Sequence, residues 1–293
     1  MKIRLRGCRG SIPVPGPTTV KYGGNTTCHE IITDDGDLVI IDGGSGIRQL
    51  GLDQMAHLPL KVTLLITHTH WDHIQGIPFY TPLFVPGNKI QICGTFDPVY
   101  GKELRDILAG QMEYCYFPIC ESELNADITY TDLQENDEIT LGSTTITPII
   151  MSHPVLNYGY RIASKGKSFF FTGDYEPATN IYQPNEEGYE LYQQIVDEQN
   201  QVICDFMKDV DVAVMDAQYT SEEYATKQGW GHGTYDSCIS LAEKAKVKKL
   251  YLTHHDPTRT DDQLDYIYSE LQEKYAHINC DIQMAKEGVE IVL

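Results

Sequence analysis

Short apolar runs recur along the whole chain, and each is followed by a polar or glycine-containing segment. Runs such as Val62–Ile66 and Val212–Met215 are apolar at nearly every position, which is typical of strands buried on both faces. The pattern predicts strands at Ile3–Leu5, Leu38–Ile41, Val62–Ile66, Ile90–Cys93, Thr145–Ile150, Tyr160–Ile162, Ser168–Phe171, Val212–Met215 and Lys249–Leu252. It predicts helices at Ser45–Leu52, Asp97–Leu108, Tyr189–Lys208, Thr234–Ala245 and Asp261–Tyr275. Because no repeat or low-complexity linker interrupts this mixture, we expect one layered α/β or α+β domain over residues 1–293.

The composition excludes several classes of function. No apolar run approaches the ~18 residues of a membrane span, and the charged N-terminal segment lacks the apolar centre of a signal peptide. None of the eight cysteines forms a C-x-x-C pair, so we expect reduced thiols in a cytoplasmic protein without a membrane partner. The formal net charge of −20 disfavours long RNA or DNA, since such affinity comes from Lys and Arg. A small anion held by metal ions remains compatible with it.

Histidines and aspartates follow four of the expected strands at nearly the same offset. They are found in Thr67–His73, at His153, at Asp174 and in Thr253–His255, each shortly after an apolar run. Ligand sites in layered proteins gather beyond the strand ends, so these side chains converge if the strands are neighbours. Imidazole and carboxylate ligands together suit zinc, manganese or iron(II).

The segment Thr67–His73, with the sequence THTHWDH, is the most specific of these groups. His68 and His70 alternate and can face one metal ion. Asp72 and His73 lie past a turn and can reach a second ion. One short loop therefore supplies ligands to two ions.

Together with His153, Phe171–Asp174 and Thr253–His254, this segment resembles the metallo-β-lactamase superfamily over nearly the whole chain. The resemblance implies an α+β fold, an αββα sandwich of two mixed β-sheets flanked by helices. It also implies two divalent ions, zinc first with Mn²⁺ or Fe²⁺ as alternatives. The implied ligands are His68, His70 and His153 for one ion, Asp72, His73 and His254 for the other, and Asp174 with a hydroxide between them. His254 is preferred over His255 because it directly follows Leu-Thr, and Asp42 resembles a carboxylate that supports the metal-bound histidines.

Three further segments resemble the tRNase Z-like phosphodiesterase branch of that superfamily. They are Tyr22–Cys28, His153–Ile162 and Gly229–Thr234, the last placed before a helix and a strand that ends in Leu-Thr-His. The resemblance implies that His232 assists the leaving oxygen and is catalytic, as is Asp72. Asn25 and Thr26 become candidate phosphate contacts or supports of the metal ligands.

The chain departs from tRNA 3′-processing enzymes because it lacks a basic, glycine-rich arm, and the region after Asp174 is acidic. Two divalent ions carry a total charge of about +4, and the negative charges of Asp72, Asp174 and a hydroxide cancel about three of these. The centre therefore keeps a net charge of about +1, which suits an anionic substrate. The pattern resembles cyclic nucleotide phosphodiesterases, including phage-type enzymes that degrade cyclic mononucleotide immune signals. We therefore expect hydrolysis of a small phosphodiester, a cyclic mononucleotide, to a linear nucleoside monophosphate.

Two expectations concern the surroundings of this site. Tyr114, Tyr116 and Phe117 can form an aromatic lid over a base, and the branch resemblance implies a homodimer. The alternatives are a tRNA 3′-processing endonuclease, a lactonase or other ester hydrolase of the same fold, and a non-catalytic binding module.

Overall fold

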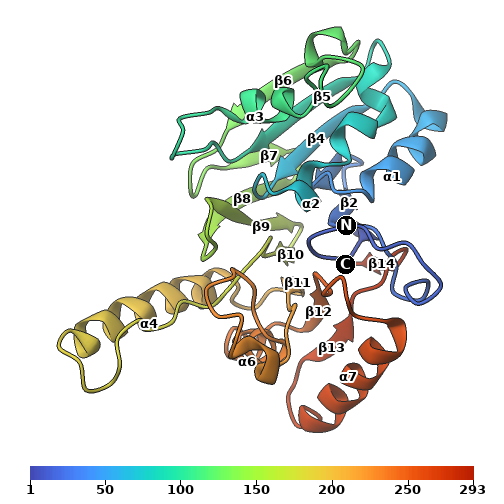
Figure 1. Cartoon of the computed structure of the whole chain (residues 1–293). Helices are drawn as coiled ribbons and strands as arrows, with labels where there is room; N and C mark the ends of the chain where they lie inside the picture. Colours follow the sequence, from blue (N-terminus) through green and yellow to red (C-terminus); the bar gives the residue numbers. More distant parts are fainter.

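Two seven-stranded β-sheets lie face to face in the computed structural model, which describes residues 1–293 (Figure 1). The first sheet has the spatial order β14 (Glu290–Val292), β1 (Lys2–Gly7), β2 (Cys28–Ile32), β3 (Leu38–Ile41), β4 (Lys61–Ile66), β5 (Lys89–Gly94) and β6 (Asp127–Asp132). The second has the order β13 (Asp281–Met284), β12 (Lys249–Thr253), β11 (Val212–Asp216), β10 (Lys167–Phe171), β9 (Asn157–Ser164), β8 (Thr144–Met151) and β7 (Ile139–Leu141).

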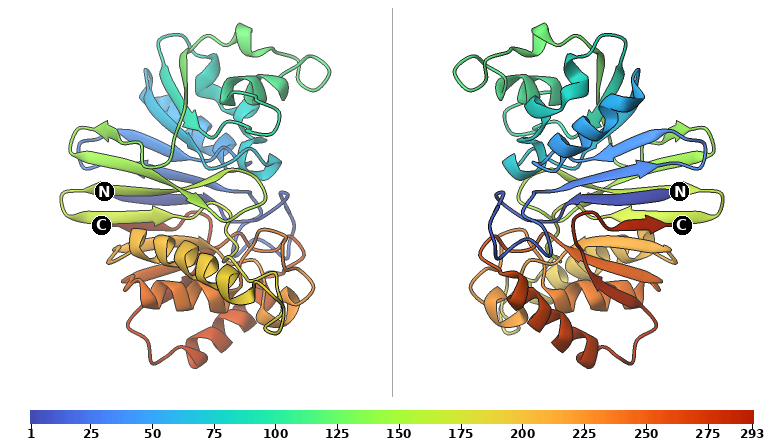
Figure 2. Two further views of the ribbon diagram at one scale, coloured as in Figure 1. Left: turned by 90° about the vertical axis from the view of Figure 1, so that its left-hand side faces the viewer. Right: turned by 90° about the vertical axis from the view of Figure 1, so that its right-hand side faces the viewer.

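Both sheets are mixed. Strands β3 to β6 run parallel to their neighbours, as do β10 to β13, while the remaining pairs are antiparallel. The terminal strands β1 and β14 pair with each other, so both chain ends lie at the same edge of the sandwich (Figure 2). The parallel strands read as apolar runs because a helix layer or the other sheet covers each face.

Helices cover the outer faces of both sheets, which confirms the expected αββα sandwich (Figure 1). The α-helices are α1 (Ile47–Gln54), α2 (Trp71–Ile74), α3 (Leu104–Gly110), α4 (Tyr189–Phe206), α5 (Ser221–Tyr224), α6 (Tyr235–Lys244) and α7 (Asp261–Lys274). Short 3₁₀ turns occur at Met55–His57, Ile77–Phe79, Thr81–Phe84 and Glu121–Glu123. None of the helices combines the length and the apolar character that crossing a bilayer requires.

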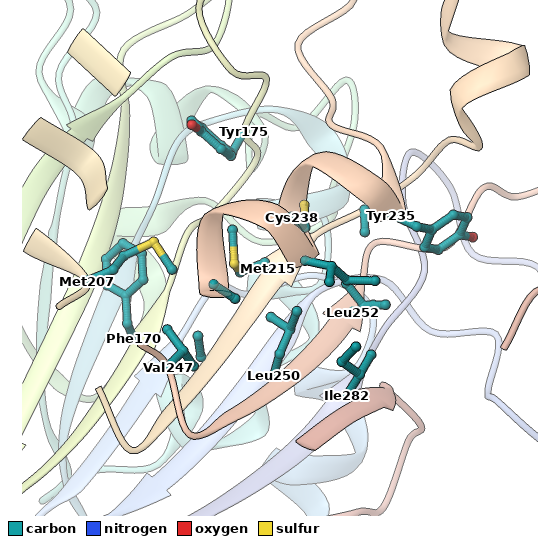
Figure 3. Packing of buried hydrophobic residues seen from close by; sticks show 14 of the residues in the cluster. Phe170, Tyr175, Met207, Met215, Tyr235, Cys238, Val247, Leu250, Leu252 and Ile282 are labelled. Carbon is teal, nitrogen blue, oxygen red and sulfur yellow. The ribbon is translucent and has the colours of Figure 1, made fainter. Parts of the chain in front are cut away.

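Buried apolar side chains form three clusters that match these layers. The central one, which includes Leu5, Ile41 and Phe171, fills the space between the sheets. Figure 3 shows an outer one, in which side chains such as Met215 and Leu250 pack beneath α6. This packing holds the two sheets at a constant distance, and it therefore also holds the loops at the strand ends in place.

The structure differs from the sequence expectations in two respects. It adds β2, β6, β7, β13 and β14, which are short, polar or lie at sheet edges, so their apolar signal is weak. The helix predicted for Asp97–Leu108 is wrong at its start, since α3 begins at Leu104. Asp97 accepts the N–H of Val99 and pairs with Lys102, and Gly101 has a φ of 65°, so this segment forms a turn instead.

Candidate active site

The ends of β4, β8, β10 and β12 meet at one edge of the sandwich, with α2 beside them. These elements bring together all the residues expected to bind metal: His68, His70, Asp72, His73, His153, Asp174 and His254. Asp72 and His73 lie within α2, in one helical turn, whereas the sequence had suggested that they follow a turn. The first sheet supplies the loop after β4, and the second sheet supplies the other loops.

The first group consists of His68, His70, His153 and Asp174, whose ligand atoms all lie within 4.8 Å of one another. His153 Nε2 is 3.2 Å from His70 Nδ1, and His68 Nε2 is 3.5 Å from Asp174 Oδ2. Three neutral nitrogen donors and one carboxylate therefore face a common point.

The second group consists of Asp72, His73, Asp174 and His254. His254 Nε2 lies 3.1 Å from Asp72 Oδ2 and 3.2 Å from Asp174 Oδ1. His73 Nε2 lies 3.1 Å from Asp174 Oδ1 and 3.5 Å from Asp72 Oδ2. Asp174 thus belongs to both groups, with one oxygen toward each.

These spacings fit divalent cations. Four ligands at about 2.0–2.1 Å around a tetrahedral ion lie about 3.3 Å apart, and the four histidine–carboxylate separations in the second group are 3.1 to 3.5 Å. His68 Nε2, His73 Nε2 and Asp174 Oδ1 are buried without a hydrogen-bond partner in the protein. Buried polar atoms without partners are costly, so cations bound in the two groups would account for the position of these three atoms.

Hydrogen bonds to the outer ring nitrogens hold the histidines in place. Asp42 Oδ2 accepts from His73 Nδ1 at 2.7 Å, and its other oxygen accepts the N–H of Thr67 at 2.8 Å. Asp42 therefore holds both the His73 ring and the start of the ligand loop, as a carboxylate that supports a metal-bound histidine would. His255, by contrast, donates from Nε2 to the carbonyl of Ala285 and does not belong to either group.

Burial favours the neutral form of His68 and His70. In His73 and His254 desolvation also lowers the pKa, but neighbouring carboxylates, Asp174 first, outweigh it and raise that pKa. Desolvation, with a further contribution from His153, lowers the pKa of His70 to about 4. The pKa of His68 is lowered as well, and desolvation is again the largest cause. A neutral imidazole offers a nitrogen lone pair, which is the form that binds a metal.

One residue of the site, Asp216, was not predicted from the sequence. This carboxylate ends β11, and its Oδ2 accepts from His232 Nδ1 at 2.8 Å and from the N–H of Tyr175 at 3.0 Å. Desolvation alone lowers the pKa of His232, but the carboxylates of Asp216 and Asp174 outweigh it and raise that pKa. Asp216 carried a usable signal, because it also follows a buried apolar strand directly.

Asn25 and Thr26 are engaged within the protein. The Asn25 side chain donates to Glu287 at 3.0 Å, and Thr26 is fully buried with its hydroxyl accepting the N–H of Ser45 at 2.8 Å. These bonds fix the N-terminal loop against the start of α1. A direct phosphate contact by either residue stays a prediction.

The expected aromatic lid lies after α3. Tyr114 and Tyr116 are 68% and 71% exposed, and the Tyr114 hydroxyl donates to Glu123. Phe117 packs edge-to-face on Phe79, with 5.3 Å between the ring centroids. This contact links the lid segment to the 3₁₀ turn after α2; its closure over a base stays a prediction.

Comparisons with known proteins agree with this arrangement. A family model described as a β-lactamase superfamily domain matches residues 38–255. The ribonuclease Z of Exiguobacterium sibiricum is 28% identical over 246 residues, which cover 72% of this chain and 77% of that protein.

Two solved structures show the same fold over their full length. The metallo-β-lactamase fold protein YhfI from Bacillus subtilis superimposes with a TM-score of 0.68 at 18% identity, covering 99% of this chain and 98% of that one. A diphosphatase from the PhnP family superimposes with a TM-score of 0.65 at 19% identity, covering 100% of this chain and 97% of that one.

Proposed function

The chain belongs to the β-lactamase superfamily, and on that premise we propose that it is a phosphodiesterase that binds two divalent cations and hydrolyses a cyclic mononucleotide. The product is a linear nucleoside monophosphate. One observation carries the proposal: two ligand groups share Asp174, and the Asp216–His232 pair lies directly beside them.

His68, His70, His153 and Asp174 would hold one cation, and Asp72, His73, Asp174 and His254 would hold the other. Zinc is the first choice for this set of nitrogen and oxygen donors, while manganese and iron(II) also accept it. When bound, such ions polarise a phosphoryl oxygen and lower the pKa of water, which supplies a nucleophile near neutral pH.

His232 would protonate the leaving oxygen. Its Nδ1 is bound to Asp216, and its Nε2 makes no hydrogen bond within the protein. Hydrolysis breaks the bond between phosphorus and the ribose oxygen, adds a hydroxyl to phosphorus and leaves a proton on that oxygen. His232 would donate this proton from Nε2, while Asp216 holds the ring and stabilises its charged form.

The charge of the chain favours a small substrate. With a formal net charge of −20, the surface repels a polynucleotide, whereas the cations attract a single phosphodiester locally. The relationship to a ribonuclease Z and the fold of a diphosphatase both support chemistry at a phosphorus–oxygen bond. Cleavage of precursor tRNA remains the second candidate because of that ribonuclease Z relative. We also propose that the protein forms a homodimer.

The test is a substrate panel with the metal-loaded protein. It contains 2′,3′- and 3′,5′-cyclic mononucleotides, bis(p-nitrophenyl) phosphate, a lactone and a precursor tRNA, with metal content measured in parallel. Turnover of a cyclic mononucleotide that is lost in Asp174→Ala but kept in Asp211→Asn supports the proposal. Asp211 is a matched control because it is also a buried carboxylate, yet it binds Ser168 and Lys248 away from the ligand groups. Turnover of the lactone or the tRNA alone would contradict the substrate assignment.

A further inference from the structure

A rigid loop connects α5 to α6 and delivers His232 to the site. Glu176, which is 8% exposed, accepts the N–H groups of Gly229 and Gly231 at 2.7 Å each. It also accepts the hydroxyl of Tyr224 at the end of α5. A single buried carboxylate thus fixes both glycines that flank position 230.

The same loop is pressed against a ligand of the first group. Gly231 has a φ of 90°, and its carbonyl accepts from His153 Nδ1 at 2.9 Å. A Cβ at this position would lie 2.5 Å from His153 Nδ1, so only glycine fits here. The residue before Gly231 is therefore joined directly to a backbone position that contacts a ligand of the first group.

That residue is Trp230, whose side chain is 58% exposed. An indole on a flexible surface loop needs no explanation, but this one is carried by a backbone that is anchored on both sides. Lys227 Nζ lies 4.2 Å from the Trp230 ring centroid and 5.5 Å from that of Tyr219. Tyr219 in turn contacts His232, with 6.1 Å between the ring centroids.

Lys227 forms these two cation–π contacts and no ion pair. Its ammonium group contacts one face of the indole and also contacts Tyr219, the ring that lies beside His232. The exposed indole surface is free to accept another flat ring.

We propose that Trp230 is the platform on which the base of the nucleotide substrate stacks, with Lys227 holding the indole in place. This inference rests on the proposed function and adds the residue that recognises the non-reacting part of the substrate. Metal ligands bind the phosphodiester whatever is attached to it, so a separate aromatic surface is needed to favour a nucleotide over other diesters. Base–aromatic stacking supplies that preference and tolerates different bases.

The kinetic test uses two diesters that differ only in the base. One is a cyclic mononucleotide, and the other is the cyclic phosphate of 1-O-methylribose. Trp230→Ala should raise KM for the nucleotide roughly 5- to 150-fold and leave kcat/KM for the base-free ester unchanged. Trp230→Phe should restore most of the loss, and Tyr266→Ala, which removes a 63% exposed ring on α7, should change neither substrate.

An equal loss on both esters would overturn the platform, as would unchanged kinetics in Trp230→Ala. If Trp230→Ala instead shifts the protein's oligomeric state in sedimentation and harms both esters alike, Trp230 is a contact between copies and the proposal fails. If Tyr116→Ala raises KM for the nucleotide and Trp230→Ala does not, the base is bound by the lid after α3.

A binding measurement keeps this inference separate from the proposed function. The chain has only two tryptophans, Trp71 and Trp230, so in Trp71→Phe the emission comes from Trp230 alone. A nucleoside monophosphate should quench that emission, while ribose 5-phosphate and inorganic phosphate should not. Quenching without turnover of any cyclic nucleotide would refute the proposed reaction but support base stacking on Trp230. Turnover without quenching would support the proposed reaction but refute base stacking on Trp230.

Discussion

Replacing Asp216 by Asn tests the proton-donor role of His232 without removing the ring. Asn has the same shape, so the contacts of its side-chain oxygen with His232 Nδ1 and the N–H of Tyr175 can persist, but the negative charge is gone. The carboxylate raises the pKa of His232, and without it the burial of the ring favours the neutral form. General acid catalysis contributes roughly 10²- to 10⁴-fold, and we expect kcat for a cyclic mononucleotide to fall within that range.

The leaving group makes this prediction specific. The ribose oxygen is a poor leaving group that needs a proton, whereas p-nitrophenolate departs without one. Asp216→Asn should therefore reduce hydrolysis of bis(p-nitrophenyl) phosphate far less than that of the cyclic nucleotide. His232→Ala should show the same contrast, and the double variant should be no worse than His232→Ala alone, because the two residues act as one unit.

Metal analysis is the necessary control, since Asp216 Oδ1 also lies 3.6 Å from His254 Nδ1. Gln218 Oε1 accepts from the same nitrogen at 3.2 Å and can keep that ring in place. Equal losses on both substrates with full metal content would refute the proton-donor assignment. A parallel loss of metal would show that Asp216 acts through His254 instead.

Three other predictions follow from particular contacts. Glu176→Gln should retain metal but lower kcat roughly tenfold. The amide oxygen of Gln can still accept one of the two glycine N–H groups, but its NH2 group cannot accept the other, and a hydrogen bond to a charged group is worth about 1.5–3 kcal/mol; stopped-flow turnover and metal analysis check this. Hydrogen bonds from Ser143, with a contribution from Lys165, lower the pKa of Asp35 to about 2. The Asp35 carboxylate therefore contributes to the free energy of unfolding above the ordinary pKa of Asp, about 4, and this contribution is lost as pH falls toward 2. Asp35→Asn should flatten the stability profile between about pH 4 and 2 in urea unfolding, and an unchanged slope would contradict the assignment. Chelation of bound metal should lower Tm, because a cation binds the folded ligand groups and not the unfolded chain; calorimetry with and without added zinc measures the shift.

The sequence contained most of the candidate metal site because its candidate ligands follow apolar strands at short, regular offsets. Parallel strands that end at one edge bring such residues together whatever the rest of the fold does. Asp216 obeys the same rule, since it ends the buried strand β11, but no neighbouring histidine and no matching family segment marked it. The strand β6 was invisible for a different reason: its residues are mostly exposed at a sheet edge, so they carry no apolar run.

Glu176 shows what a sequence pattern cannot reveal. Its partners Tyr224, Gly229 and Gly231 lie 48 to 55 residues further along the chain, and no local spacing connects them. The role of Trp230 depends on the same contacts, since its neighbours become a fixed loop only when this carboxylate is buried beneath them. The roles of Glu176 and Trp230 could therefore be inferred only once the fold had shown these contacts.

The ligand set also explains why the two sheets must stack before the site exists. His68, His70, Asp72 and His73 come from the first sheet, whereas His153, Asp174 and His254 come from the second. Each ligand group contains residues from both, so a bound cation crosslinks the sandwich at the edge opposite the paired termini. Binding energy of this kind is also folding energy. Metal removal should therefore loosen the edge that carries the ligand groups first, and hydrogen exchange should rise there, in α2 and the loop after β10, before it rises in the strands of the central core.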